Sequence, residues 1–283
     1  MELGIVLALL CAAATQLGFL CKHRGASCAP LVDLTRPLAS AKALLASRWF
    51  AIGMAVAAGA WILHVGALAM APLSTVQVAL STGVVMLAVL GDRLFGHTVG
   101  SRQWAGVAMT ATGLVLLVLT MPAPGHDSAF AVPGVILFET VAIAFGVLLI
   151  GAPRMGAPAH HHGALLGAAA GVLFGVGDVA LKALTGAVAD GGAIALVLSP
   201  WLPIAVIAAV LAFLASARGF QEGEAVPVIA CTSTAANVTV ITGGIVVFGD
   251  ALAGGVLLGV QILAFALVAV AALVTPHGRP LPA

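Results

Sequence analysis

Nine long apolar stretches divide this sequence and constrain its fold more than any other feature. They cover residues 3–21, 49–70, 73–91, 101–121, 130–150, 163–187, 200–217, 225–248 and 253–274. Each is long enough to cross a hydrocarbon layer about 30 Å thick as a helix. The runs are too long for transmembrane strands and lack their strict alternation of apolar and polar residues. The sequence therefore predicts an all-α membrane protein with nine transmembrane helices in one polytopic domain, residues 1–283.

The composition excludes several other classes of protein. Hydrophobic residues make up 62% of the chain and charged residues 7%, whereas a soluble domain carries about 25% charged residues. The net charge is +1 and the sequence has no basic run, so a nucleic-acid partner is not expected. The sequence also has no phosphate-binding glycine loop and no nucleophile constellation. We therefore expect neither an enzyme nor an ATP-driven pump, and we expect no cofactor.

Lysine and arginine residues gather on one side of the nine-helix arrangement. Ten of the eleven lie in loops or helix ends that share one face: Lys22, Arg24, Arg36, Lys42, Arg48, Arg93, Arg102, Arg154, Arg218 and Arg279. The positive-inside rule then places the N-terminus outside and the C-terminus in the cytoplasm, in the plasma (inner) membrane. Glu2 stands where a signal peptide carries positive charge, so the first stretch is expected to be a span.

The sequence contains a weak internal repeat. Residues 91–94 read Gly-Asp-Arg-Leu at the end of the third stretch, and residues 249–252 read Gly-Asp-Ala-Leu at the end of the eighth. Pro72 and Pro227 stand near the starts of the same two stretches. With nine spans these stretches cross in opposite directions, so the halves 1–121 and 130–274 are inverted relative to each other. Inverted repeats are typical of alternating-access secondary transporters.

These motifs resemble those of a known superfamily. The run Ala71-Pro72, Gly91-Asp92-Arg93-Leu94, Gly106 and Gly113 resembles the drug/metabolite transporter (DMT, EamA-like) superfamily. Gly4, Phe19, Lys22 and Gly25, with Ala152-Pro153-Arg154 and Lys182, resemble its NIPA-type magnesium-transporter branch. The resemblance covers nearly the whole chain and implies a transporter of small solutes that works by alternating access.

Three functions remain open at this point. The first is transport of a small organic solute, coupled to protons through Glu139. The second is a NIPA-like pathway for Mg²⁺ or another divalent cation, although the branch's Gly-Glu and Asn positions hold Ala60-Trp61 and His64 here. A hard cation needs oxygen ligands, and this chain has few carboxylates. The third is a non-transporting membrane scaffold or lipid-handling protein, since fold alone does not assign function. Partners would be the substrate, the bilayer and, as an open option, a second copy in a homodimer.

Ionisable groups inside the stretches are the first candidate site residues. Glu139 lies about 14 Å into the fifth stretch, where a carboxylate is costly and is a candidate cation ligand or proton carrier. Asp178 and Lys182 are one helical turn apart in the sixth stretch and are a candidate gate or counter-ion pair, or a structural pair. Four glycines spaced four apart predict close helix packing there; we call them the glycine ladder, Gly163, Gly167, Gly171 and Gly175.

Uncharged polar groups at similar depth are the second set of candidates. They are Gln16, His64, Gln77, Ser81, Thr82, Ser233, Thr234 and Asn237. Pairs one turn apart share a helix face, so together they are expected to line a small hydrogen-bonding pocket for a solute. Hydroxyl groups can instead bond the carbonyls of their own helix, whereas a buried amide is harder to satisfy.

Two further features carry weaker predictions. His160, His161 and His162 follow one another in a cytoplasmic loop, but without cysteine or acidic companions they predict a weak metal site at most. The four cysteines, at 11, 21, 28 and 231, show no pairing pattern, and we expect no disulfide in a reducing compartment.

Overall fold

The computed structural model describes residues 2–33, 36–70, 79–80, 82–95, 100–120, 132–249 and 254–274. Within these residues every regular element is a helix. The helices are α1 (Glu2–Ser27), α2 (Pro37–Ala46), α3 (Arg48–Met70), α5 (Gly83–Phe95), α6 (Ser101–Thr120), α7 (Val132–Gly151), α8 (His162–Leu198), α9 (Trp201–Glu222), α10 (Ala225–Phe248) and α11 (Val256–Val274), with 3-10 turns η1 (Ala152–Met155) and η2 (Ala159–His161).

The described helices form a multi-pass membrane protein. Five segments have the length and apolarity to cross a bilayer: Glu2–Ser27, Val132–Met155, Ala159–Leu184, Trp201–Glu222 and Ala225–Phe248. α2 and α3 together make a sixth candidate, bent by 95° between them. Shorter apolar segments lie in α6 and α11. The all-α membrane class is therefore confirmed, and each of the nine predicted stretches overlaps a described helix.

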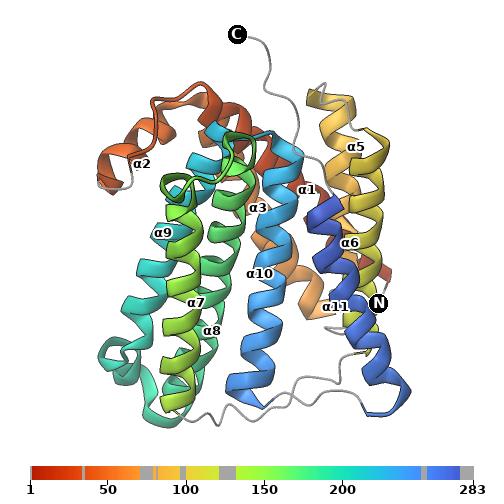
Figure 1. Cartoon of the computed structure of the whole chain (residues 1–283). Coiled ribbons are helices and arrows are strands. Elements are labelled where there is room, and N and C mark those ends of the chain that lie inside the picture. Colours follow the sequence, from red (N-terminus) through yellow and green to blue (C-terminus); the bar gives the residue numbers. More distant parts are fainter. Residues whose placement is uncertain are drawn as a thin grey trace.

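Figure 1 shows how these helices lie in the bundle. α7, α8 and α9 stand on one side, α5, α6 and α11 on the other, and α10 stands between them. α1 packs extensively on α3, α8 on α9 and α10, and α6 on α11. The end of α1, all of α2, η1, η2 and the end of α9 lie at one end of the bundle, the upper end in Figure 1. We call this the basic end, because most of the loop lysines and arginines belong to these segments.

The glycine ladder sets the distance between α8 and α10. A Cβ on Gly171 would overlap the carbonyl oxygen of Thr232, and one on Gly167 would come within 2.7 Å of the carbonyl oxygen of Val228. Only glycine lets the two backbones approach this closely. The same device recurs in the first half, where a Cβ on Gly53 of α3 would come within 2.7 Å of the carbonyl oxygen of Gly18 in α1.

Two helices differ from the predicted stretches. α2 lies in a segment that the apolar pattern leaves as a loop; Pro37 at its first turn fits a helix start, because proline needs no backbone donor there. The sixth predicted stretch ends at 187, but α8 continues to Leu198 across a kink at Gly192, whose φ is 68°. Glycine adopts this left-handed conformation without strain, so the kink is local.

Candidate functional site

Glu139 is a carboxyl group buried inside the bundle. α7 turns Val135, Glu139 and Gly146 inward, and Gly146 packs against Leu173 and Ala169 of α8. The Glu139 residue is 3% exposed, and its Oε1 atom has no hydrogen-bond partner. An anionic carboxylate is costly in such a place without a counter-charge or donors. A proton or a cation bound at Oε1 would supply what is missing.

An apolar groove lies on another face of α7. It has a volume of about 370 Å³ and is lined by residues of α7, α8 and α10, among them Phe138. Its walls include Phe145 and Val172, and its polar atoms come from threonines such as Thr234 and Thr242. The Thr242 hydroxyl already donates to the carbonyl oxygen of Val238 at 2.7 Å. The groove therefore offers an apolar surface with little hydrogen-bonding capacity of its own.

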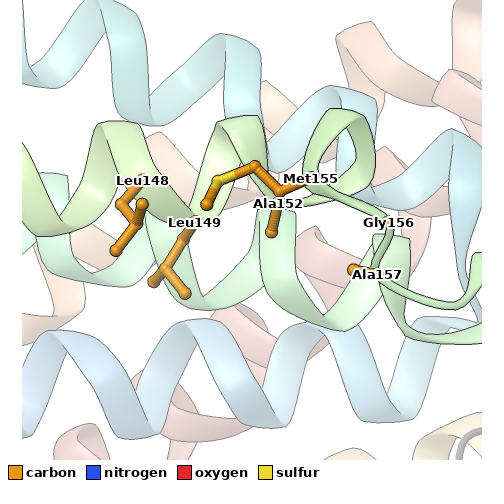
Figure 2. A pocket seen from close by; sticks show the side chains of 6 residues that line it. All are labelled: Leu148, Leu149, Ala152, Met155, Gly156 and Ala157. Carbon is orange, nitrogen blue, oxygen red and sulfur yellow. The ribbon is translucent and has the colours of Figure 1, made fainter.

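A second hollow lies at the end of α7 that faces η1 (Figure 2). It measures about 450 Å³ and is lined by six residues from α7 to Ala157, none with a charged or hydrogen-bonding side chain. Figure 2 shows Leu148, Leu149 and Met155 along one wall. The side chains that line this hollow offer no charge or hydrogen bond to a ligand.

Gln16 is the second buried polar group with an open acceptor. It lies in α1 with 7% exposure, and its Oε1 atom has no hydrogen-bond partner. The amide packs against Gly83 at the start of α5, where a Cβ would come within 3.0 Å of Nε2. A buried carbonyl oxygen left open in this way can accept a hydrogen bond from a ligand or a water molecule.

Asn237 and Thr232 of α10 form hydrogen bonds along their own helix. Asn237 is exposed and donates through Nδ2 to the carbonyl oxygen of Ser233 at 2.7 Å. Thr232 donates to the carbonyl oxygen of Val228 at 2.8 Å. Ser233 is half-buried and Thr234 is buried. These bonds are the back-bonding alternative that the sequence left open for hydroxyl groups.

The partners predicted for this polar face are only partly placed. Gln77 and Ser81 lie outside the described residues. Thr82 donates to the carbonyl oxygen of Ala79 at 2.6 Å, and His64 is half-buried in α3. Within the described residues, no hydrogen bond or ion pair joins any two of Glu139, Gln16 and Asn237. The common hydrogen-bonding pocket therefore stays a prediction.

Asp178 and Lys182 lie one turn apart in α8 but in different surroundings. Asp178 is exposed and Lys182 is half-buried. The Lys182 ammonium nitrogen lies 4.1 Å from the centroid of the Phe248 ring at the end of α10. A cation over an aromatic face is stabilised by the ring's quadrupole, so Lys182 ties α8 to α10.

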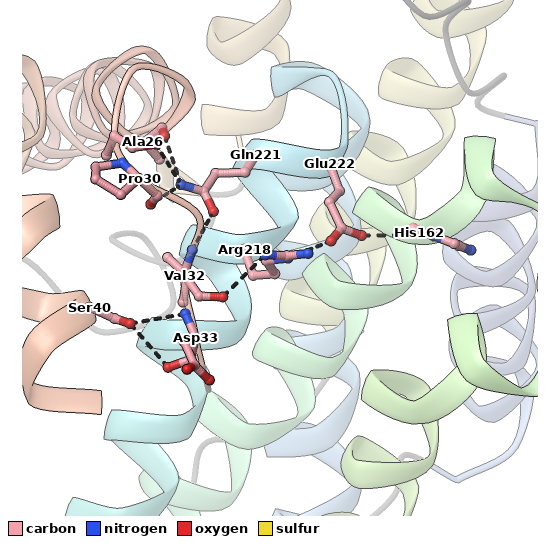
Figure 3. A network of polar contacts seen from close by, with 10 residues as sticks. Ala26, Pro30, Val32, Asp33, Ser40, His162, Arg218, Gln221 and Glu222 are labelled. Atoms are coloured by element: carbon pink, nitrogen blue, oxygen red, sulfur yellow. Dashed lines mark hydrogen bonds and ion pairs between the residues drawn. The ribbon is translucent and has the colours of Figure 1, made fainter. Parts of the chain in front are cut away.

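A polar network at the basic end joins segments far apart in the sequence (Figure 3). Gln221 of α9 reaches the loop after α1: its Oε1 accepts from the Val32 backbone N–H at 2.9 Å. Its Nε2 donates to the carbonyl oxygens of Ala26 and Pro30, both at 3.0 Å. One side chain thus uses both its donor and its acceptor on the backbone of another helix's end.

Arg218 and Glu222 extend this network to α8. Arg218 pairs with Glu222 one turn along α9 and donates through Nη1 to the Val32 carbonyl oxygen at 3.2 Å. Glu222 Oε2 lies 3.7 Å from His162 Nδ1, and His162 Nε2 lies 2.8 Å from the Ala157 carbonyl oxygen. We call Arg218, Gln221, Glu222 and His162, with the backbone of 26–33, the basic-end network.

Sequence reasoning missed this network. Residues 218–224 read Arg-Gly-Phe-Gln-Glu-Gly-Glu, which is typical of a solvated loop between spans. The partners are mostly backbone atoms about 190 positions away along the chain. Every residue has these backbone groups, so the sequence does not indicate which of them bind a distant side chain.

Metal-binding and thiol chemistry find little support among the described residues. No group of three or more His, Cys, Asp or Glu residues is arranged to hold a metal ion in that part of the chain. The rings of His160 and His161 stack with centroids 4.0 Å apart. All four cysteines are free thiols, and the Cys11 thiol donates to the carbonyl oxygen of Ala60 at 3.1 Å.

Comparison with protein-family models, with curated proteins and with solved structures finds no match to this chain. The fold and the buried groups therefore define its class by themselves. The chain is a multi-pass α-helical membrane protein with a carboxyl group buried between apolar helices.

Proposed function

We propose that this chain is a secondary transporter of DMT-like architecture. In this proposal nine spans form two inverted halves, residues 1–121 and 130–274, that move a small organic solute by alternating access. Glu139 couples the movement to protons. The N-terminus is outside and the C-terminus is cytoplasmic.

The observation that carries the proposal is the matched packing of the helices in the two halves. α1 packs on α3 and α5, and α8 packs on α9 and α10. α5 contacts α6 as α10 contacts α11, while α5 lies against α10 and α6 against α11. A twofold relation that pairs α1 with α8, α3 with α9, α5 with α10 and α6 with α11 would produce this pattern. Two such repeats with a site between them are the architecture of many secondary transporters.

α7 supports the inverted orientation. It lies between the two sets of four helices along the sequence and has no counterpart in the pairing. A single extra span between two repeats makes the second repeat enter the membrane from the opposite side. Such inversion gives a transporter two related conformations, each open to one side.

The basic-end network supports alternating access because its hydrogen bonds join the two halves at the basic end. Gln221 and Arg218 belong to the second half, and their partners at residues 26–32 belong to the first. A contact of this kind must form in the conformation closed at that end and break in the other. It is therefore a candidate gate.

The open acceptors support a solute of modest polarity. Gln16 Oε1 and Glu139 Oε1 are buried and unpaired, and the groove between α7, α8 and α10 is mainly apolar. Such surroundings suit an organic solute with a few hydrogen-bond donors. Glu139 can exchange a proton as the bundle changes conformation, which is what coupling requires.

Ligand-dependent thermal stabilisation of the purified protein tests the proposal. A ligand that binds the folded state adds about 2.7 kcal/mol of stability at a concentration one hundred times Kd. We expect a saturable rise in Tm with a small organic solute from a panel of metabolites and drug-like compounds. A rise with Mg²⁺ alone would instead favour the NIPA-like cation pathway. No saturable rise with any compound or cation would favour a scaffold or lipid-handling protein.

A further inference from the structure

α2 lies across the direction of the bundle at the basic end. Its axis makes an angle of 95° with that of α3, and α3 runs along α1, a helix long and apolar enough to span the membrane. The corner is at Ser47, whose backbone is extended (φ −73°, ψ 121°). A helix perpendicular to the spans at one end of the bundle lies in the plane of the membrane surface.

One face of α2 is packed and the other is open. Ser40 and Leu44 are buried, and Leu44 joins the core cluster that includes Phe50. Leu38 and Leu45, on the opposite face, are 86% and 50% exposed, and Leu31 in the preceding loop is 69% exposed. Large apolar side chains at this exposure need a partner that is itself apolar.

The open face also carries positive charge. Lys42 in the middle of α2 is exposed, as are Arg36 directly before α2 and Arg48 at the start of α3. Residues 22–48 contain five lysines and arginines and a single acidic residue, Asp33. The combination of exposed leucines with flanking basic residues is that of helices lying in a membrane interface. Its charge is complementary to anionic headgroups.

Trp49 is a second indication, beside the exposed leucines and basic residues, of where the membrane–water interface lies. It follows the corner directly, and the Arg24 guanidinium lies 4.5 Å from the centroid of its ring. Tryptophan is enriched where the hydrocarbon layer meets the headgroups, because its ring is amphipathic. α2 therefore begins and ends at the depth where phospholipid headgroups lie.

We propose that α2 is an interfacial helix that binds anionic phospholipid. Leu31, Leu38 and Leu45 enter the upper acyl layer, and Arg36, Lys42 and Arg48 bind the phosphate headgroups of the same leaflet. This inference is independent of what the bundle transports.

The first experiment measures the headgroup preference. The purified protein is titrated in detergent micelles with phosphatidylglycerol or phosphatidylcholine, and Tm is followed. We expect Tm to rise with phosphatidylglycerol and much less with phosphatidylcholine. Each basic residue near an anionic surface contributes about fivefold in affinity. The triple variant Arg36→Gln/Lys42→Gln/Arg48→Gln should therefore need about a hundredfold more phosphatidylglycerol.

Arg154→Gln is the matched control, because Arg154 is also exposed at the basic end but lies on η1. It should retain the wild-type titration. Equal stabilisation of the wild type by both lipids, or a triple variant that titrates like the wild type, would overturn the headgroup assignment.

The second experiment measures depth. Leu38→Cys is introduced with Cys28→Ser, which removes the exposed native thiol, and is labelled with an environment-sensitive fluorophore. In vesicles of brominated phospholipid we expect strong quenching at position 38. A label at Ala159→Cys, on the exposed turn η2, should not be quenched. An unquenched label at 38, or disulfide cross-linking between two copies through it, would overturn the proposal in favour of water or a second copy of the chain.

Discussion

Among the described residues, Glu139 and Gln16 are the two buried side chains that could receive a ligand's hydrogen-bond donor inside the bundle. Both are buried, and both keep a side-chain oxygen without a hydrogen-bond partner. The sequence pointed to Glu139 by its depth in an apolar stretch. It could not show which neighbours the carboxyl group meets, because that depends on how α7 is rotated against α8. Asn237 was also a candidate from sequence, yet its amide bonds the carbonyl oxygen of Ser233 in its own helix.

Glu139→Gln tests the coupling proposal at the level of one atom. Glutamine keeps the size and one oxygen but cannot exchange a proton. We expect solute flux in proteoliposomes to lose its dependence on an imposed pH gradient while exchange of solute for solute continues. Glu2→Gln, an exposed carboxyl group at the start of α1, is the control and should keep the dependence. Gradient-driven flux at the wild-type rate in Glu139→Gln would contradict the assignment.

Gly171→Ala tests the close approach of α8 and α10. The added methyl group would overlap the Thr232 carbonyl oxygen, so the backbones must separate. Overpacking of this kind costs about 1–3 kcal/mol, and we expect a matching fall in Tm of the purified protein. Gly177→Ala, in the same helix, meets its nearest atom at 3.7 Å and should be neutral or slightly stabilising. Equal effects of the two variants would refute the role given to Gly171.

At the scale of elements, apolar length predicted most of the helices well. The eighth stretch, 225–248, has the same bounds as α10. Both the apolar run and the helix end before Gly249, whose φ of 66° is left-handed and terminates the helix. α2 was missed because it is ten residues long and mixes leucines with alanine, serine and lysine. Its position depends on contacts with α3 and α9. Contacts between helices cannot be predicted from the local sequence of α2.

Gln221→Met tests the basic-end network as a gate. Methionine keeps the length of the side chain but loses the bonds to Val32, Ala26 and Pro30. If the conformation closed at the basic end loses about 1.4 kcal/mol of stability, the population of the conformation open at this end rises about tenfold. In a Cys28→Ser background, the buried thiol of Cys21 should then be alkylated about tenfold faster.

A variant elsewhere separates gate opening from general destabilisation. Gln261 of α11 is also buried, and its Nε2 donates to the Thr120 carbonyl oxygen at 3.1 Å. This bond also joins the two halves, but it lies at the last residue of α6 and outside the basic-end network. Gln261→Met should lower Tm but leave the alkylation of Cys21 unchanged. If both variants speed the alkylation equally, the network is a structural contact and not a gate.

At the scale of the whole molecule, the distribution of charge predicts which side of the membrane each end occupies. Cys28 is exposed just after α1 at the basic end and is a natural probe of sidedness. The positive-inside rule places this end in the cytoplasm. A membrane-impermeant maleimide should therefore label Cys28 in inside-out vesicles and not in right-side-out ones. Labelling in right-side-out vesicles alone would reverse the proposed orientation.

The proposed relation between the two halves has less support in the sequence than the helices themselves. The short repeats at 91–94 and 249–252 suggested it, but residues 250–252 lie outside the described part of the chain. The proposal rests instead on packing, because the helices of one half contact one another in the same pattern as those of the other half. The basic-end network then gives this arrangement one end at which the halves are joined.

Solute flux in proteoliposomes tests the central claim most directly. The compound that stabilises the purified protein is placed outside vesicles containing the protein, and its entry is followed with and without a pH gradient. The transporter proposal predicts saturable uptake above that of protein-free vesicles, with a rate that rises with the gradient. Uptake no faster than in protein-free vesicles, for a compound that binds saturably, would contradict it.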